Sequence, residues 1–517
     1  MKLSDYVIDF LAAQGITHIF EVAGGALAHL LDSLYDRNDI AAISMHHEMA
    51  ASIAAEGYAR ASENIGAAMA TSGPGATNLI TGIGSCFFDS IPCLFITGQV
   101  NTYECKLDHP TRQVGFQETD IVSIVKPITK DAFIVTDPKR IRYLLEKSIY
   151  TAKSGRPGPV LIDLPLNIQR AEIDPESLES FQSPSPNGLP LNLDEAVKEI
   201  AQLLNGASRP VILSGGGVRL SKAEYALLEF VHKTGMPVVT SLMGIDSFPH
   251  DDPSFMGLIG TYGNRYANFT VSNCDLLLAL GTRLDTRQTG TKPCTFARAA
   301  KIIHVDIDSG ELNNKVIAHY PINMDVKEFL TLLNRCIDTY DTRKIASWKQ
   351  TVKAYKDRYE PRFVSNNGNI DPNRFIQKLS EYLPSDAIVC VDVGQNQMWS
   401  AQSLMVKKGQ RFLTEGGMGS MGSALPMAIG ACFAQPAKMV VVITGDGGFQ
   451  LNIQELETMY HHNLPIKIIL LNNKCYGMIK QFQTQYFNSK YQSTVRGYSS
   501  PDFQNVVSAY KIPVMKI

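Results

Sequence analysis

Short apolar runs recur along the whole chain, and each ends at glycine, proline or a polar residue. Segments with helical periodicity lie between them. A continuous apolar run is typical of a strand buried on both faces, as in a parallel sheet covered by helices. The alternation therefore predicts an α/β fold built from doubly wound parallel sheets. The predicted strands lie in GAAMATSGPGATN, IPCLFITGQ, GPVLIDLP, RPVILSGGG, MPVVTS, CDLLLALGTR, KIIHVDID, DAIVCVDVGQ, MVVVITGDGG, IKIILLNN and IPVMKI.

Polar segments separate these strands into three sets. The segment PESLESFQSPSPNGLPLN, near residues 174–191, is rich in proline and serine and is predicted to be a linker. A second polar stretch, DTRKIASWKQTVKAYKDRYEPRFVSNNGNIDP, precedes the last set. A chain of 517 residues is also too long for one hydrophobic core. We expect three domains, at residues 1–175, 192–340 and 365–517.

The composition excludes several classes of partner. The formal net charge is -2, so no basic surface for nucleic acid is expected. The nine cysteines are scattered without a CxxC pair, which argues against a zinc site or disulfide framework and favours buried thiols. Asp5 and Asp9 interrupt the first apolar stretch, which predicts an amphipathic helix and not a signal peptide. No apolar run approaches the ~18 residues of a membrane span. We expect a cytoplasmic, soluble protein that binds small molecules and other subunits, with no nucleic acid or membrane partner.

A carboxylate and an amide end two consecutive predicted strands of the last domain. Asp446 lies among Gly445, Gly447 and Gly448 after one apolar run, and Asn473 ends the next run. If these strands are neighbours, their carboxyl ends bring together the oxygen ligands that Mg²⁺ on a diphosphate requires. The glycines would let backbone amides approach the anion. A lone GDG would be only a turn, but the pair with a helix between its members favours a metal and diphosphate site.

GDG followed by NN at this spacing resembles the signature of the thiamine diphosphate enzymes. In ISMHHEMAASIAAEGYAR, the resemblance places on Glu48 the role of bonding a ring nitrogen of the cofactor's aminopyrimidine, so that the ring can take up the C2 proton. Most glutamates on helices are simply solvated. Glu56, farther along the same predicted helix, is expected to be one of these.

Further segments are similar to the acetohydroxyacid (acetolactate) synthase large-subunit branch of that family. They are TSGPGATNLITGIGSCFFDSIPCLFITGQV, FQETDIVSIVKPITK, SGRPGPVLIDLP and VDVGQNQMWSAQ. The resemblance covers residues 1 to about 510 and implies that Gly25 approaches the reacting carbonyl, while Phe116, Gln117 and Lys130 line the channel. A methionine such as Met421 could equally be core filler. The implied cofactor residues are Val393, Gln395, Asn396, Gly419, Met421, Gly445, Gly447, Gly448 and Met478, and the implied metal residues are Asp446, Asn473 and Cys475.

The middle domain carries residues that match FAD contacts in this branch. Arg283 in GTRLDTRQTG suits a pyrophosphate, and Asp306 in HVDID suits a ribose or adenine edge. Gly216 and Gly217 follow a predicted strand, and Asp325 lies in NMDVK. These residues could instead form surface ion pairs on a vestigial domain, because glycine and aspartate motifs alone are weak evidence. We expect FAD to be bound here as a structural group, since the reaction that the resemblance implies is not a redox reaction.

Three departures from the branch fall where it recognises its acceptor substrate. Phe482 stands where tryptophan is usual, Thr261 and Tyr262 replace a Met-His pair, and a DDR tripeptide is changed at its centre, before Arg287. Phe482, Thr261 and Arg287 are therefore the candidate substrate residues. We expect a carboligase that decarboxylates pyruvate and transfers the two-carbon unit to a second keto acceptor. The alternatives are an acceptor as large as a keto sugar nucleotide, or a simple 2-keto acid decarboxylase.

The resemblance also bears on assembly. In this family Glu48 and Asp446 would belong to active sites shared between subunits, which implies a homodimer or homotetramer. It leaves room for a regulatory subunit. After AYKIPVMKI the family continues with a closing helix and strand, so the last domain is expected to be cut short.

Overall fold

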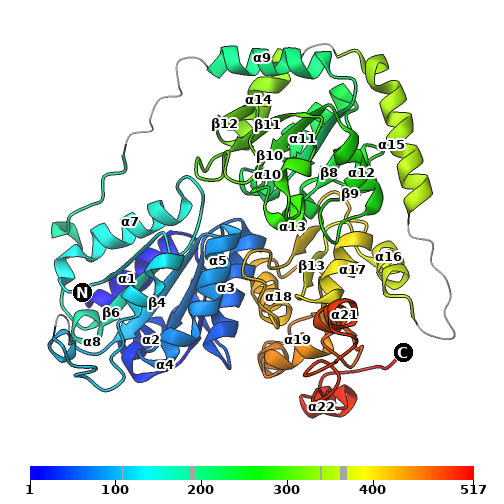
Figure 1. Ribbon diagram of the computed structural model, residues 1–517. Coiled ribbons are helices and arrows are strands. Elements are labelled where there is room, and N and C mark those ends of the chain that lie inside the picture. Colours follow the sequence, from blue (N-terminus) through cyan, green and yellow to red (C-terminus); the bar gives the residue numbers. More distant parts are fainter. Residues whose placement is uncertain (107–108, 185–192, 338–339, 361–369) are drawn as a thin grey trace. The chain divides into compact units, whose positions relative to one another are not determined.

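Three parallel sheets organise the chain. The computed structural model describes residues 1–106, 109–184, 193–337, 340–360 and 370–517 (Figure 1). The sheets have strand orders β2-β1-β3-β4-β6-β5, β12-β11-β10-β7-β8-β9 and β14-β13-β15-β16. Every strand pair with a defined register is parallel, which confirms the predicted fold class. The predicted domain starts at 192 and 365, and the linker residues 185–191, lie outside the described residues.

The described chain divides into two units. One contains residues 1–185, 387–397 and 413–517, and therefore the first sheet and most of the third. The other contains residues 186–386 and 398–412, and therefore the middle sheet. None of the described helices is long and apolar enough to cross a membrane.

The first sheet has helices on both faces. The predicted amphipathic helix at the N-terminus is confirmed as α1. The strands are β1 (His18–Val22), β2 (Ala41–Ser44), β3 (Gly66–Ala70), β4 (Cys93–Gln99), β5 (Asp131–Ile134) and β6 (Val160–Pro165). The helices are α1 (Leu3–Ala13), α2 (Ala28–Leu34), α3 (Glu48–Ser62), α4 (Pro74–Asn78), α5 (Ile80–Asp89), α6 (Ile121–Val125), α7 (Ile141–Lys153) and α8 (Leu166–Gln169).

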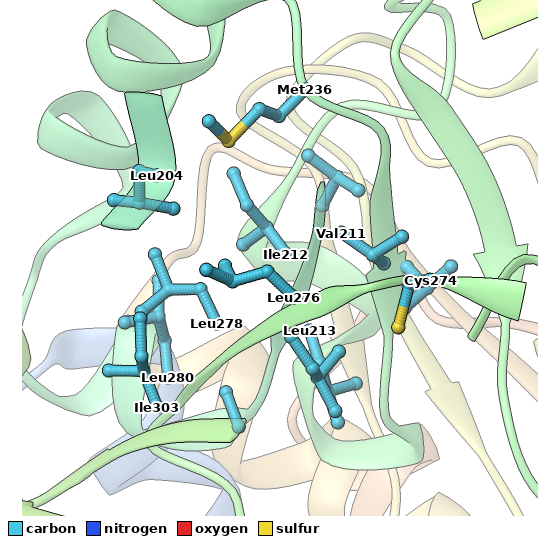
Figure 2. Packing of buried hydrophobic residues seen from close by; sticks show 14 of the residues in the cluster. Leu204, Val211, Ile212, Leu213, Met236, Cys274, Leu276, Leu278, Leu280 and Ile303 are labelled. Carbon is cyan, nitrogen blue, oxygen red and sulfur yellow. The ribbon is translucent and has the colours of Figure 1, made fainter. Parts of the chain in front are cut away.

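The middle sheet is centred on β10, whose five residues are all buried. Figure 2 shows Leu276, Leu278 and Leu280 of this strand among aliphatic side chains of its neighbours and of α9. The strands are β7 (Pro210–Ser214), β8 (Val238–Thr240), β9 (Phe255–Leu258), β10 (Leu276–Leu280), β11 (Lys301–Asp306) and β12 (Tyr320–Asn323). The helices are α9 (Leu193–Gly206), α10 (Gly216–Leu220), α11 (Glu224–Thr234), α12 (Arg265–Asn273), α13 (Thr286–Thr289), α14 (Val326–Cys336) and α15 (Ala346–Tyr359).

Helix α18 (Ala424–Ala434) packs against strands of the third sheet and closely against α3 (Figure 1). A Cβ on Gly57 of α3 would lie 2.1 Å from the Met427 carbonyl oxygen, so the backbones of α3 and α18 are almost in contact. The strands are β13 (Ile388–Val391), β14 (Arg411–Leu413), β15 (Val440–Gly445) and β16 (Lys467–Leu471). The helices are α16 (Pro372–Tyr382), α17 (Gln395–Ser403), α18 (Ala424–Ala434), α19 (Asp446–Leu451), α20 (Glu455–His461), α21 (Gly477–Tyr486) and α22 (Phe503–Ala509).

Two expectations from the sequence are wrong. Residues 512–517, the predicted strand IPVMKI, form no strand, because no neighbouring strand of the described chain pairs with them. The cysteines are not all buried, since Cys294 and Cys336 are exposed and Cys105 is half-buried.

Candidate active site

Asp446 and Asn473 lie at the same edge of the third sheet. Asp446 begins α19 directly after β15, and Asn473 follows β16. The two strands are neighbours, with Gly445 paired to Leu471 at their carboxyl ends. The condition on which the predicted metal site depends is therefore met.

The side chains at this edge are already connected by hydrogen bonds. Asp446 is buried, and its Oδ2 accepts a hydrogen bond of 2.8 Å from the Tyr498 hydroxyl. The exposed Asn473 donates from Nδ2 to Gln395 Oε1 over 3.0 Å and accepts from the Cys475 amide over 3.2 Å. The hydrogen bonds thus link the end of β16 to the start of α17, and the start of α19 to Tyr498.

Glycine at this edge allows an approach that a side chain would block. A Cβ on Gly448 would lie 2.6 Å from Asp392 Oδ2, and one on Gly447 would lie 2.5 Å from the Tyr476 ring. Met421 reaches the same place, with its terminal methyl 3.5 Å from that second position. The loops that follow β13, β14 and β16 therefore come together around the start of α19.

Asp392, which the sequence analysis did not select, organises this edge. Its carboxylate is 1% exposed and accepts from the amides of Val393 and Gly422 over 2.7 and 2.8 Å and from the Thr444 hydroxyl over 2.8 Å. Burial raises the pKa of Asp392 to about 6, although these hydrogen bonds oppose the shift. An aspartate that directly follows the apolar run IVCV was the available signal.

The remaining residues predicted to hold the cofactor come from several segments of the third domain. Asn396 is buried and donates from Nδ2 to the Asp392 carbonyl over 2.6 Å. Gly419 has a positive φ of 70°, in the loop that ends at Gly422. Met478 lies in α21. The Cys475 thiol is buried, and burial raises its pKa.

Glu48 is the first residue of α3, immediately after β2 and a short loop. Its Oε2 accepts a hydrogen bond of 2.9 Å from Asn78 Nδ2, and its side chain is half-buried. The ring Nδ1 of His47 accepts from the Met49 amide over 3.1 Å and so caps the helix. Asn78 is a second residue that the sequence analysis did not select. Among the described residues, Glu48 and Asp446 share no hydrogen bond.

The other candidates of the first domain lie in different environments. Gly25 is exposed, with open space where a Cβ would be. Gln117 has a positive φ of 64° and lies against Gly73, while Phe116 is 86% exposed. The Lys130 amine binds the Ser154 carbonyl, and burial lowers its pKa.

Glu56 is not a solvated glutamate, contrary to the sequence-based expectation. Its side chain is fully buried where α3 meets α5 and α18. Its oxygens bind Arg60 Nη1 over 3.2 Å and the Ser85 hydroxyl over 2.9 Å. Burial raises the pKa of Glu56 to about 7, although Arg60 opposes the shift. The pattern of α3 alone did not reveal this burial, because the covering helix comes from the distant C-terminal part of the chain.

In the middle domain the predicted FAD residues have local structural roles. Asp325 caps α14 by accepting from the amides of Lys327 and Glu328. The Asp306 carboxylate accepts from the Asp308 amide over 2.9 Å. Arg283 and Asp285 form an ion pair of 3.5 Å. Gly217 lies so close to Gly281 that a Cβ would be 2.6 Å from its Cα, and Gly216 begins the short helix α10.

Two of the three candidate substrate residues meet. The amide and hydroxyl of Thr261 donate to the Arg287 carbonyl over 2.8 and 3.2 Å, and both side chains are exposed. Phe482 lies on α21, where its ring is 52% exposed and contacts the rings of Tyr486 and Phe487.

Comparison with known proteins gives a match in each of the three domains. Residues 1–124 match the thiamine pyrophosphate enzyme N-terminal TPP binding domain, 197–333 the central domain, and 392–517 the C-terminal TPP binding domain. The chain belongs to the thiamine pyrophosphate enzyme family. The predicted family is thus confirmed, and thiamine diphosphate is its cofactor.

Relatives in the acetolactate synthase branch match along the whole chain. A probable acetolactate synthase large subunit of Methanocaldococcus jannaschii is 39% identical over 100% of this chain and 88% of its own length. The acetolactate synthase isozyme 2 large subunit of Escherichia coli is 38% identical over 99% and 90%. Acetolactate synthase 2 of Nicotiana tabacum is 38% identical over 100% and 78%.

Proposed function

We propose that this thiamine diphosphate enzyme catalyses an acetolactate synthase-type carboligation. The bond between C1 and C2 of pyruvate breaks and CO2 leaves. The C2 carbon then bonds to the carbonyl carbon of a second keto acid, whose oxygen takes up a proton. The observation that carries the proposal is the similarity to acetolactate synthases along the whole of this chain. The meeting of Asp446 and Asn473 at adjacent strand ends supports it.

The third-domain edge has the chemistry to hold Mg²⁺ and a diphosphate. Mg²⁺ prefers oxygen ligands, so Asp446 and Asn473 would supply side-chain oxygens, and Cys475 would contribute its carbonyl and not its thiol. Gln395 and Asn396, with the backbone at Val393, would hold the diphosphate. Gly445, Gly447 and Gly448 would let the backbone come close to it. Gly419 and Met421 would support the cofactor from the glycine-rich loop, and Met478 from α21.

Glu48 would act as the proton relay of the first domain. When bound, thiamine diphosphate supplies the electron sink for decarboxylation. Glu48 would hold and move the proton at the aminopyrimidine nitrogen, with Asn78 fixing its second oxygen. Gly25, Phe116, Gln117 and Lys130 would surround the substrate.

We further propose that the middle domain binds FAD as a structural group. Thr240 Oγ1 and His304 Nδ1 are buried and have no hydrogen-bond partner among the described residues. Buried polar atoms are normally hydrogen-bonded, so a bound ligand would supply the missing partners. Arg283 and Asp306 would contact the dinucleotide, with Asp325, Gly216 and Gly217 shaping the surrounding loops. Denaturing the purified protein should release flavin, and the amount of flavin should rise in proportion to the amount of protein. A colourless extract from active enzyme would contradict this assignment.

Phe482, Thr261 and Arg287 would govern the choice of acceptor. One methylene in an apolar pocket is worth about 1–3 kcal/mol, and Phe offers less contact area than Trp. With equal pyruvate and 2-ketobutyrate, we expect no strong excess of acetohydroxybutyrate over acetolactate. Phe482→Trp should raise the share of acetohydroxybutyrate. An unchanged product ratio would show that other residues shape the pocket.

The assembly is proposed from the same similarity. A homodimer or homotetramer would share active sites between subunits, and the name "large subunit" of the relatives suggests a smaller regulatory partner.

Product identification tests the proposed function. The protein is incubated with pyruvate, Mg²⁺ and thiamine diphosphate, and the products are separated by chromatography. Acetolactate is the expected product. Acetaldehyde without acetolactate would instead indicate a simple decarboxylase, and Asp446→Ala provides the control in which neither forms.

A further inference from the structure

The loop before Glu48 is fixed residue by residue. The Met45 amide donates to the Glu21 carbonyl over 2.8 Å, and the His47 ring caps α3. Between them, the His46 amide donates over 3.0 Å to Glu455 Oε1, a side chain of the C-terminal domain. Two of these contacts are local to the first domain, and the middle one comes from about 400 residues later in the sequence.

Both carboxylate oxygens of Glu455 accept hydrogen bonds at this contact. It begins α20 and is fully buried. Its Oε2 accepts from the Thr458 hydroxyl over 2.7 Å, and that hydroxyl lies 3.0 Å from His46 Nδ1. Burial raises the pKa of Glu455, while its bonds to Thr458 and His46 oppose the shift. Burying a carboxylate costs free energy unless it is hydrogen-bonded. These hydrogen-bond partners therefore stabilise Glu455 in its buried position.

We propose that Glu455 is a positioning residue for Glu48, and the proposal rests on the function assigned to Glu48 above. It holds the backbone of His46, two residues before Glu48, and so sets where α3 begins and where the Glu48 carboxylate points. The contact also connects the loop before α3, the helix that begins at Glu48, to α20. Helix α20 is the next helix after α19, which begins at Asp446. Misplacing a catalytic group by about 1 Å can cost roughly 10²-fold in rate.

The test compares three variants of the full chain. Glu455→Ala removes both acceptors, whereas Glu455→Gln keeps an oxygen for the His46 amide. Glu457→Ala is the control, since Glu457 lies on the same helix but is exposed. The readouts are amide hydrogen exchange of residues 45–52 without cofactor, and kcat and KM for pyruvate at saturating cofactor.

We expect Glu455→Ala to speed exchange at His46 by up to about 10-fold, because a hydrogen bond contributes about 0.5–1.5 kcal/mol net. Its kcat should fall about 10²-fold with little change in KM. Glu455→Gln should restore both the protection from exchange and most of kcat. This is the result expected if Glu455 acts by holding the His46 backbone in place and its negative charge is not required.

Several results would overturn the proposal. Exchange and kcat of Glu455→Ala that match Glu457→Ala would do so, and so would a Gln variant as damaged as the Ala variant. If Glu455→Ala does not fold, Thr458→Val removes only the supporting hydroxyl, and unchanged exchange in residues 45–52 of that variant would also overturn the proposal. The exchange result decides the contact even in a protein inactive with pyruvate, whereas that inactivity would contradict only the proposed function.

Discussion

Asp392 shows what a single buried carboxylate does at the cofactor edge. It accepts hydrogen bonds from the loop after β13, from the glycine-rich loop at Gly422 and from Thr444 at the end of β15. Three segments that are distant in sequence are thereby held at one point. Burial opposes ionisation of this group, so the stability of the edge depends on pH.

Replacing Asp392 by asparagine should remove that dependence. Burial raises the pKa of Asp392 from 3.8 to about 6, so the fold favours the protonated form. This contribution to the free energy of unfolding is fully present below pH 3.8 and is lost as pH rises through 6. From about pH 4 to 6, the wild-type free energy of unfolding should fall on the order of 3 kcal/mol relative to Asp392→Asn. Urea denaturation from pH 4 to 8 measures the difference.

The exposed Asp386 provides a matched control, because Asp386→Asn should leave the pH profile of the wild-type protein unchanged. A wild-type free energy of unfolding that stays level with that of Asp392→Asn, or rises relative to it, from pH 4 to 6 would contradict the assignment.

The sequence was informative for residues whose role follows from their place at a strand end. Asp446 and Asn473 could be predicted as site residues because each is a polar residue at the end of an apolar run. Glu48 required the family resemblance. Glu56 and Glu455 could not be placed, since their burial is caused by helices far away in sequence and no local pattern records it.

Helices α3 and α18 connect Glu48 to the third sheet. A Cβ on Gly430 of α18 would lie 1.9 Å from the Ala54 carbonyl oxygen of α3, which is closer than two non-bonded atoms can approach. On the other side, Gly57 meets the Met427 backbone in the same way. The small residues at this contact allow the two helix backbones to pack without intervening side chains.

Gly430→Ala should therefore be strongly destabilising. The added methyl must push the helices apart, and overpacking costs about 1–3 kcal/mol, more than alanine gains as a helix former. Gly206→Ala is the control, because nothing lies within 4 Å of its added methyl. Thermal unfolding should show a lower midpoint for Gly430→Ala only. Equal midpoints would mean that α3 and α18 do not pack this closely.

Strands were predictable where an apolar run has at least one neighbouring strand with which to pair. Ten of the eleven predicted runs contain a strand of the structure, as in β7, β10 and β15. IPVMKI is also mostly apolar, but residues 512–517 pair with no strand of the described chain. Pairing depends on what lies beside a run in space, and hydropathy along the chain does not contain that information.

At the scale of the whole molecule, the two halves of the proposed chemistry have separate partners within the chain. Glu48 binds Asn78 of the first domain, and Asp446 binds Tyr498 of the third. The family resemblance joins such halves across subunits. A dimer would then contain two sites, each with one Glu48 and one Asp446 from different chains.

Mixed dimers test this sharing. Coexpression of Glu48→Gln and Asp446→Ala chains, with different affinity tags, gives dimers in which one shared site has both defects and the other has none. The purified mixed dimer should regain about half of the wild-type activity, whereas either variant alone stays inactive. If each site were built within one chain, both sites of the mixed dimer would carry a defect and activity would not return.

The stoichiometry of the reaction distinguishes carboligation from simple decarboxylation. Pyruvate consumed and CO2 released are measured together in the presence of Mg²⁺ and thiamine diphosphate. Carboligation predicts two pyruvate molecules consumed for each CO2, and Glu48→Gln should slow both by about 10²–10⁴ while the cofactor stays bound. One pyruvate consumed for each CO2 would show that the protein is a simple decarboxylase and not a carboligase.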